Sequence, residues 1–301
     1  MYETDEELLE LYYQVSNKGK WGENDQIGTL NYITETKRKK AAKLVQIGKA
    51  ISISRPIDTS LTTRNNIPSI HYMLFDSVNP ISALDFIGIP VHTFSNTHLD
   101  SVAHVNWEGN IYNGRKSSEV ITPKGLSWGG IHNMRDGIFT RGVLLDICKV
   151  RGVKYLNVDE YIYARDLEAA EKLAGVQVES GDCIFVRSGL GPREEAEGLA
   201  DPIGKGLPGI HPDVLPWLHE REVAIWSGDC YDKMPYKSKR FPLVMHMIGL
   251  ASMGLVQLDI PNIELLYNTC EKLSRYEFLL TASPLYINGG TGSPINPACI
   301  F

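Results

Sequence analysis

Three histidines and an aspartate lie close together in the stretch from His92 to Gly114. His98 and Asp100 are separated by one residue, so in an extended segment their side chains point to the same face. An imidazole and a carboxylate that converge in this way are typical ligands of a divalent metal ion. His104 follows four positions later and can reach the same pocket after a turn. The pattern therefore favours a metal site.

A second interpretation is that these histidines are hydrogen-bonded residues at a polar strand end. For a single histidine this structural interpretation is the more common one. A cluster is harder to explain in this way, because a packed strand has no reason to collect so many titratable groups. We therefore treat His98, Asp100 and His104 as candidate functional residues.

The same stretch resembles the cyclase family, which includes bacterial kynurenine formamidases of tryptophan catabolism and isatin hydrolases. The family signature is His-x-Gly-Thr-His-x-Asp-x-Pro-x-His. Thr97, His98, Asp100 and His104 match this signature in identity and spacing.

Three positions depart from the signature, where Phe94, Asn96 and Val102 replace its first histidine, its glycine and its proline. The family uses that first histidine as a metal ligand, whereas a phenylalanine offers no donor atom. His92 lies on the same face as Phe94 in an extended segment. We therefore expect His92 to turn inward and supply the missing ligand.

The resemblance also assigns roles to a histidine and an acidic residue late in the chain. His246 and Asp259 stand at about the separation that the family uses to complete its site. The resemblance implies proton transfer for His246 and metal binding for Asp259. From the residues alone, the alternatives are a histidine on a helix face and an aspartate that caps a turn at a strand end.

Three further segments extend the resemblance over most of the chain. They are Trp-Gly-x-x-Asp-x-x-Gly-Thr-Leu-Asn from position 21, Gly-Ile-x-x-Arg-Gly-Val-Leu-Leu-Asp from position 137, and Gly-Gly-Thr-Gly-Ser-Pro from position 289. We place Trp21, Phe94 and Arg141 in the substrate pocket. Arg141 could bind a substrate carbonyl or carboxylate, or form a structural ion pair. Trp21 could also belong to a packed surface loop.

Two other polar residues have open interpretations. His71 is more typical of a structural hydrogen-bonding residue than of a pocket wall. Asp229 follows a predicted strand, where it is either a site residue or a turn-capping aspartate.

Local patterns predict an alternation of helices and strands. The apolar residues 84–91 predict a buried strand that leads into the central motif, and residues 190–208 predict a loop that forms a lid or pocket rim. Helices are predicted over 5–15, 34–47, 166–174, 211–222, 246–253 and 262–273, and strands over 50–57, 142–147, 183–187, 223–226, 255–260 and 276–286.

Composition excludes several classes of protein. The 301 residues carry a net charge of −6 and no strongly basic cluster, which argues against nucleic acid as a partner. The acidic first ten residues do not have the pattern of a signal peptide, and no apolar run approaches a membrane span. The five cysteines have neither disulfide-framework nor metal-clip spacing. We expect a cytoplasmic protein with reduced thiols.

The resemblance implies a single cyclase-like domain over residues 1–301, with an N-terminal helical arm over about 1–48. The implied fold is α/β: a small β-barrel or curved mixed sheet surrounded by helices, of the swivelling β/β/α type. The family commonly forms homodimers or homotetramers, so we expect a homo-oligomer.

The function implied is hydrolysis of an amide bond in a small aromatic or cyclic substrate, such as an aromatic N-formyl amide or a cyclic imide-like ring. Zinc or manganese on His98, Asp100, His92 and Asp259 would polarise the carbonyl, and His104 and His246 would move protons. One alternative is a metal-free cyclase or lyase in which Phe94 makes the pocket apolar. Another is a binding protein that has lost the chemistry.

Overall fold

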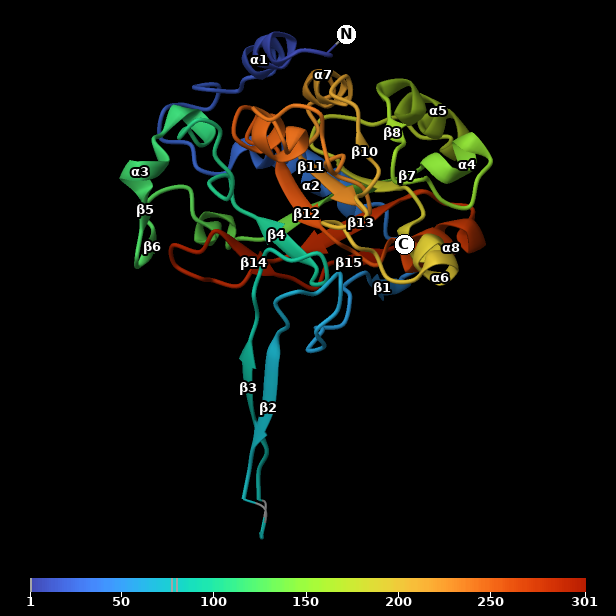
Figure 1. Cartoon of the computed structure of the whole chain (residues 1–301). Coiled ribbons are helices and arrows are strands. Elements are labelled where there is room, and N and C mark those ends of the chain that lie inside the picture. Colours follow the sequence, from blue (N-terminus) through green and yellow to red (C-terminus); the bar gives the residue numbers. More distant parts are fainter. Residues whose placement is uncertain (1, 77, 80) are drawn as a thin grey trace.

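A nine-stranded mixed sheet forms the centre of the molecule (Figure 1). The computed structural model describes residues 2–76, 78–79 and 81–301. The strand order across the sheet is β1-β15-β13-β7-β9-β11-β12-β4-β14. The strands are β1 (Ala50–Ser52), β4 (His98–Asp100), β7 (Ile138–Asp146), β9 (Cys183–Arg187), β11 (Ile225–Gly228), β12 (Val256–Asp259), β13 (Glu277–Ala282), β14 (Gly292–Pro294) and β15 (Ala298–Ile300).

The middle strands β7, β9, β11 and β12 run parallel, and the flanking strands are antiparallel. All five residues of β9 are buried, as expected for a strand covered on both faces. Ile184 and Val186 of β9 belong to one hydrophobic cluster, and Cys183 and Phe185 to another. The sheet therefore separates two cores.

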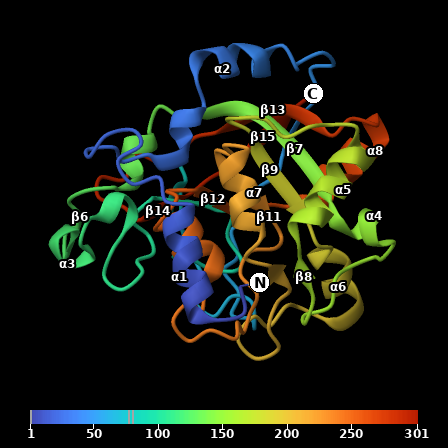
Figure 2. The ribbon, with the colours of Figure 1, turned by 90° about the horizontal axis from the view of Figure 1, so that it is seen from above.

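Helices cover the sheet on both faces, and together they make the curved, helix-surrounded α/β fold that the sequence predicts (Figures 1 and 2). No helix in the described part of the chain has the length and apolarity needed to cross a membrane. The helices are α1 (Asp5–Gln14), α2 (Glu35–Ala42), α3 (Ser117–Val120), α4 (Ile147–Arg151), α5 (Ala164–Ala174), α6 (Leu190–Glu197), α7 (Val214–Glu220) and α8 (Ile263–Leu273), with short 3₁₀ turns η1 (Gly28–Tyr32), η2 (Tyr112–Gly114) and η3 (Ile131–Met134) and a π-helix η4 (Met245–Leu250).

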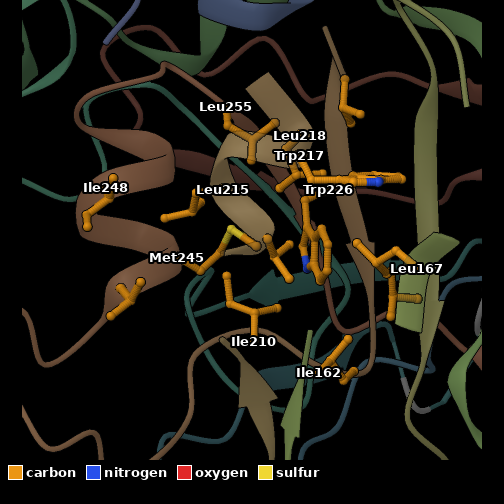
Figure 3. Close-up of a cluster of buried hydrophobic side chains, with 14 of the residues drawn as sticks. Ile162, Leu167, Ile210, Leu215, Trp217, Leu218, Trp226, Met245, Ile248 and Leu255 are labelled. Carbon is orange, nitrogen blue, oxygen red and sulfur yellow. The ribbon is translucent and has the colours of Figure 1, made fainter. Parts of the chain in front are cut away.

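One core lies between the sheet and the helices α1, α5, α7 and η4 (Figure 3). Trp226 of β11 is fully buried there, and its indole N–H donates to the Cys230 carbonyl at 3.0 Å. The other core contains Ile263, Leu266 and Cys270 of α8 packed with Phe185. These two cores hold the carboxyl ends of β11 and β12 in fixed positions.

Several predicted elements match the structure and others are wrong. The strand over 183–187 is confirmed, and the helix over 262–273 begins one residue later, after Asn262 caps it. The predicted helix over 34–47 ends at Ala42. Residues 190–208 contain four glycines and were predicted as a loop, but the first eight of them form helix α6.

The predicted buried strand over 84–91 is wrong in its burial. Residues Leu84–Gly88 form strand β3, which pairs only with β2 (Ile70–Leu74) in an antiparallel ribbon. Figure 1 shows that this ribbon projects far from the body of the molecule. Nine of its ten residues are exposed and the tenth is partly exposed. Two other small sheets pair β5 (Ile121–Thr122) with β6 (Gly125–Leu126) and β8 (Tyr161–Ile162) with β10 (Gly209–Ile210).

A truncation at the centre of the sheet tests this packing. Phe185 is fully buried and its ring lies 5.7 Å from that of Phe278. We expect Phe185→Ala to lower the free energy of unfolding by about 3–5 kcal/mol, because it removes buried contacts and leaves a cavity. Leu173→Ala on α5 is the control, since Leu173 is 54% exposed. Denaturant titration of both variants should show a large shift for the first and almost none for the second.

Candidate metal centre

The strand β4 brings the two predicted ligands to the carboxyl end of β12. In the antiparallel register, His98 lies directly opposite Asp259, so their side chains share one face of the sheet. Asp100 is two residues further along the same face, whereas Leu99 between them points into the core. The Nε2 atom of His98 is 3.6 Å from Oδ1 of Asp100 and 3.9 Å from Oδ2 of Asp259. His98 and Asp100 are therefore close enough to bind the same ion, with Asp259 beside them.

A glycine makes room for His92 beside this pair. Gly292 of β14 lies opposite Asp100, and a Cβ atom there would stand 2.6 Å from Cε1 of His92. The Nε2 atom of His92 is 2.9 Å from the Thr291 hydroxyl, which turns Nδ1 toward Asp100. Nδ1 lies 2.9 Å from Oδ1 of Asp100. The Gly-Gly-Thr-Gly-Ser-Pro segment thus seats His92 in the site.

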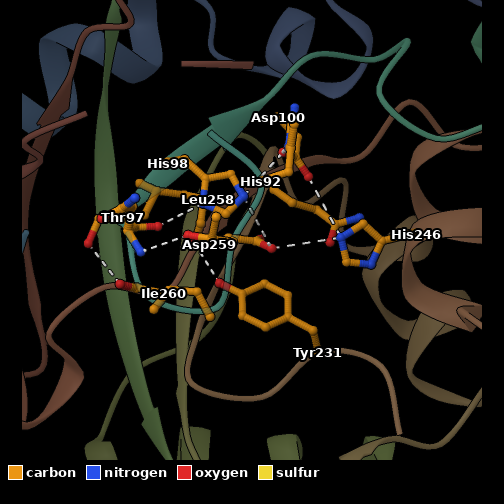
Figure 4. A network of polar contacts seen from close by, with 12 residues as sticks. His92, Thr97, His98, Asp100, Tyr231, His246, Leu258, Asp259 and Ile260 are labelled. Carbon is orange, nitrogen blue, oxygen red and sulfur yellow. Dashed lines mark hydrogen bonds and ion pairs between the residues drawn. The ribbon is translucent and has the colours of Figure 1, made fainter. Parts of the chain in front are cut away.

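His246 enters the site from the π-helix η4, a distortion often found at functional sites. Its Nδ1 contacts the buried Asp232 carboxylate, and its Nε2 lies 3.7 Å from both Asp100 and Asp259 (Figure 4). Asp232 also accepts a hydrogen bond from the Met245 amide at 2.6 Å, which holds its carboxylate in place. Sequence reasoning did not identify Asp232, and its position just after β11 is the one signal that could have done so.

The end of β12 is held in an unusual conformation. Ile260, which follows Asp259, has a φ of 54°, in the left-handed region that β-branched residues rarely adopt. The Thr97 hydroxyl donates to the Ile260 carbonyl at 2.7 Å and also accepts from the Arg55 amide at 2.9 Å. Thr97 therefore ties the central motif to the strand end that carries Asp259.

Asp100 is fully buried, and neither of its carboxylate oxygens has a hydrogen-bond partner among the described residues. Its ion-pair contacts in the described part of the chain are all with histidines. Burial would raise the pKa of this carboxyl, but the imidazoles of His104, His92 and His98 together lower it below its ordinary value. An ionised carboxylate in this position requires a positive partner.

The ring nitrogens are arranged as metal ligands require. His98 donates from Nδ1 to the Asn96 carbonyl at 2.8 Å, which leaves Nε2 free to coordinate. Asp232 binds the Nδ1 side of His246 in the same way. The donors form two groups of three that share Asp100: His92, His98 and Asp100, and Asp100, His246 and Asp259, with the atoms of each group within 4.8 Å of one another. These residues fit a divalent ion.

His104 lies at the edge of the cluster. Its ring stacks on that of His92 at 3.5 Å between centroids and stands 6.2 Å from the ring of His246. Burial lowers the pKa of His104 to about 3, the neighbouring imidazoles add to this, and Asp100 opposes it. His104 is therefore neutral at pH 7.

His246 has the opposite electrostatics. Burial alone would lower its pKa, but the carboxylates of Asp232 and Asp259 raise it well above the ordinary value. The pKa values of the two histidines that were predicted to move protons are thus shifted in opposite directions.

A cavity of about 240 Å³ opens onto this cluster. His92, His98, His104, His246 and Asp259 line one side of it. Its remaining wall is mainly apolar and includes Phe94, Val105, Leu190, Leu207, Met234 and Ile260. Tyr231 also lines it, with a hydroxyl that donates to the Leu258 carbonyl at 2.6 Å. The cavity is small and mostly hydrophobic, and the polar residues Arg64, Asp229 and Asp232 also line it.

Two residues predicted for the substrate pocket lie elsewhere. The Arg141 guanidinium binds Asp182 through Nε and Nη2 at 3.0 and 2.6 Å and Glu277 through Nη1 at 3.0 Å, so it forms the structural ion pair. Trp21 packs edge-on against Tyr32 with their centroids 4.9 Å apart. Neither residue lines the cavity. The structure therefore does not bring Arg141 and Trp21 to this cavity.

The two open interpretations resolve differently. His71 pairs with Asp85 across the exposed ribbon at 2.6 Å and is a structural residue. Asp229 caps the start of α6 by accepting hydrogen bonds from the amides of Ser188, Gly189 and Leu190, and it also lines the cavity.

Comparison with known proteins identifies the family to which this chain belongs. The family profile described as "Putative cyclase" matches residues 51–232. The crystal structure of a novel cyclase is 31% identical over 95% of this chain and 99% of its own, with a TM-score of 0.82. The chain belongs to the cyclase family. No curated protein sequence gives a significant match.

Two other structures share the cyclase fold at lower identity. An isatin hydrolase bound to the product analogue thioisatinate is 19% identical, over 87% of this chain and 95% of its own, with a TM-score of 0.61. A potential metal-dependent hydrolase with cyclase activity is 11% identical, over 83% and 98%, with a TM-score of 0.50. In this chain, His92 places a ring nitrogen beside Asp100, which Phe94 could not do because its ring has no donor atom.

Substitution of Asp100, the carboxylate that both groups of donors share, tests metal binding directly. We expect Mn²⁺ or Zn²⁺ to raise the melting temperature of the metal-depleted protein, because an ion that binds only the folded state stabilises it by about 2.7 kcal/mol at 100 times its Kd. Asp100→Asn should lose most of this gain. Asp85→Asn is the matched control, since Asp85 also pairs with a histidine but lies on the ribbon. Equal gains in all three proteins would argue against the site.

Metal titration of two variants can distinguish the contributions of His92 and Phe94 to metal affinity. We expect His92→Ala to weaken metal binding by at least the roughly 10–100-fold that loss of an outer-shell partner produces. Phe94→His should change affinity little, because His92 already faces Asp100. His71→Ala is the control. Unchanged affinity in His92→Ala together with tighter binding in Phe94→His would show that His92 is not a ligand.

Proposed function

We propose that this protein is a metal-dependent hydrolase that cleaves an amide bond in a small aromatic or cyclic substrate. The observation that carries the proposal is the buried Asp100 carboxylate, which has imidazole nitrogens around it, the nearest at 2.9 Å, and no well-aligned hydrogen bond among the described residues. A buried charge of this kind is costly unless a cation completes the site. The cluster faces a mainly apolar cavity, where a substrate can contact it directly.

The metal would be held by His98 and Asp100, with His92 and Asp259 as further donors. Imidazole and carboxylate ligands suit both zinc and manganese, so the donor set is compatible with either. When bound, such an ion acts as a Lewis acid on a carbonyl oxygen and activates water as a nucleophile. The hydrogen bond from His98 to the Asn96 carbonyl fixes the ring so that Nε2 remains a ligand atom.

Two histidines beside the donors would handle the protons. His104 is neutral at pH 7 and lines the cavity, so it can accept a proton from the attacking water and return it to the leaving nitrogen. Its low pKa makes the protonated form a strong donor. His246 is held by Asp232 and can stabilise negative charge that develops on the substrate.

The lining of the cavity supports a small aromatic or cyclic substrate. Phe94 and Tyr231 supply aromatic surface, and Leu190, Leu207 and Ile260 supply aliphatic surface. A volume of about 240 Å³ favours a small molecule over a polymer. The shared fold with an isatin hydrolase makes isatin a sensible first probe, beside an N-formyl aromatic amine.

The proposal is tested by metal-dependent turnover. The protein is stripped with a chelator, reconstituted with Zn²⁺ or Mn²⁺, and assayed against isatin and N-formylaniline by absorbance, with metal content measured in parallel. Hydrolysis that appears on reconstitution supports the proposal. Turnover by the stripped protein that metal leaves unchanged would favour the metal-free cyclase or lyase. Tight metal binding without hydrolysis across a broad amide panel would contradict the proposed reaction.

If His104 moves protons and does not bind the metal, its substitution should lower turnover and leave the metal content unchanged. We expect His104→Ala to lower kcat by roughly 10²–10⁴-fold, the usual contribution of a positioned general base. Its metal content should match that of the wild type, because His104 is outside both groups of donors. His71→Ala should retain full activity. Loss of metal in His104→Ala would instead identify His104 as a ligand.

A further inference from the structure

Arg64 is the one lysine or arginine among the described residues that line the cavity beside the metal donors. It belongs to the loop between β1 and β2, whereas the donors come from β4, from the segment before β4, from β12 and from η4. Its side chain is only 14% exposed. A cation in so protected a place loses most of its hydration, so its N–H groups need acceptors.

The ion pair of Arg64 with Glu194 of α6 satisfies only part of the guanidinium. Both hydrogen bonds to Glu194 come from a single nitrogen, Nη1, at 2.8 and 2.7 Å. The Nε atom is buried and has no hydrogen-bond partner among the described residues, and no described residue accepts from Nη2. Nε and Nη2 form an edge that a carboxylate can bind with two parallel hydrogen bonds. That edge of Arg64 is open.

A second arginine near Arg64 is unpaired. The Nε atom of Arg55 is also buried without a partner, and Arg55 forms no ion pair among the described residues. Burial lowers the pKa of Arg55, and the charge of Arg64 lowers it further. Three carboxylates oppose this shift from a distance, those of Glu194, Asp229 and Glu264. Two guanidinium groups therefore lie near each other, each with an Nε–H that lacks an acceptor in the described chain.

The three nearby carboxylates are engaged by other groups. Glu194 binds Nη1 of Arg64 and also accepts from a backbone amide at 3.0 Å. Asp229, which lines the cavity as well, accepts from three backbone amides at the start of α6. Glu264 binds Arg187 through both of its oxygens. None of these carboxylates reaches the open edge of Arg64, so the acceptor for that edge comes from within the cavity.

The loop that carries Arg64 is held in place by its own hydrogen bonds. Asn65, the next residue, is fully buried and donates to two carbonyls of the same loop at 3.1 and 2.8 Å. The Thr63 hydroxyl donates to the Ala200 carbonyl at 3.0 Å, which ties the loop to the segment after α6. A guanidinium fixed on such a loop loses little freedom when it binds an anion, and this favours affinity.

We propose that Arg64 binds a carboxylate of the substrate through Nε and Nη2, so that the cavity takes a small aromatic or cyclic amide that carries an acidic group. The amide then lies toward the metal donors and the acidic group toward the loop of Arg64, with Arg55 as a second positive charge nearby. A carboxylate fits because its two oxygens match the two open nitrogens. This inference rests on the proposed function, because it names a further group of the same substrate.

The test is a binding measurement that does not require hydrolysis. The probes are the meta and para isomers of acetylbenzoate, which carry a ketone in place of the amide, and the corresponding nitroacetophenones as neutral isosteres. Calorimetric titration in the presence of Mn²⁺ gives the Kd of each probe for wild type, Arg64→Gln, Glu194→Gln and Arg240→Gln. Arg240 is the matched control, because it pairs with Glu108 at 2.7 Å and does not line the cavity.

We expect wild type and Arg240→Gln to bind at least one acetylbenzoate isomer about 10–100-fold more tightly than its neutral isostere, the range for a charge-assisted hydrogen bond. Arg64→Gln should lose this preference and keep the Kd of the neutral probe, which also shows that the cavity is intact. Glu194→Gln should keep or increase the preference, because it removes a negative charge that competes for Arg64.

Equal affinity of wild type for the acidic and the neutral probes would overturn the inference, and this comparison needs no variant. A preference that survives in Arg64→Gln would place the carboxylate elsewhere in the cavity and would overturn it too. Loss of the preference in both Arg64→Gln and Glu194→Gln would assign the ion pair a structural role. Binding that depends on Arg64, together with no hydrolysis of any amide, would contradict the proposed function alone.

Discussion

The buried carboxylate of Asp100 is the constraint on which the site depends. A charge with no exposed surface loses its hydration, and this loss must be offset by other charges or by an ion. The chain offers it three imidazoles and, in the described residues, neither lysine nor arginine. Imidazoles bind metal in their neutral form, whereas a lysine or arginine would neutralise Asp100 and exclude an ion. This set of partners is the basis on which we propose metal binding.

The sheet explains how residues distant in sequence reach Asp100. Parallel strands β11 and β12 end at one edge, where Asp232 and Asp259 follow or terminate them. Strand β4 runs antiparallel to β12 and places His98 opposite Asp259. Gly292 on the other side lacks the side chain that would displace His92. Four neighbouring strands, β11, β12, β4 and β14, thus position the donors other than His246, and the two cores pack against these strands.

The part of the site that could be predicted from the sequence is the part that depends on local geometry. His98 and Asp100 share a face because any extended segment alternates. The pairing of Asp232 with His246 depends on how a π-helix packs beside the end of β11, which no local spacing encodes. Arg141 shows the reverse case, since a chemically suitable residue is already satisfied by Asp182 and Glu277 in the fold.

The fold was predictable where apolar residues are buried by the chain itself. The run Cys183–Arg187 predicts a strand because it is rich in β-forming apolar residues, and the fold buries both of its faces. The mainly apolar run from Leu84 also predicts a buried strand, yet it lies in the exposed ribbon. An apolar pattern shows that a surface must be covered, and it does not say by which molecule. The sequence does not predict helix α6 because glycine and proline lower helix propensity, while Asp229, whose carboxylate caps its start, lies distant in sequence just after β11.

Two features of the described chain stand out, one buried and one exposed. Asp100 has no hydrogen-bond partner among the described residues and has imidazole nitrogens around it, which is why we propose a divalent cation as its partner. The β2–β3 ribbon exposes nine of its ten strand residues. The two features are linked by the chain, because β3 ends at Gly88 and His92 follows it after a short connection. Asn96 binds the Ser69 hydroxyl and the Pro90 carbonyl, which ties the base of the ribbon to the motif. The base of the ribbon is therefore connected to the segment that carries His92 to its place beside Asp100.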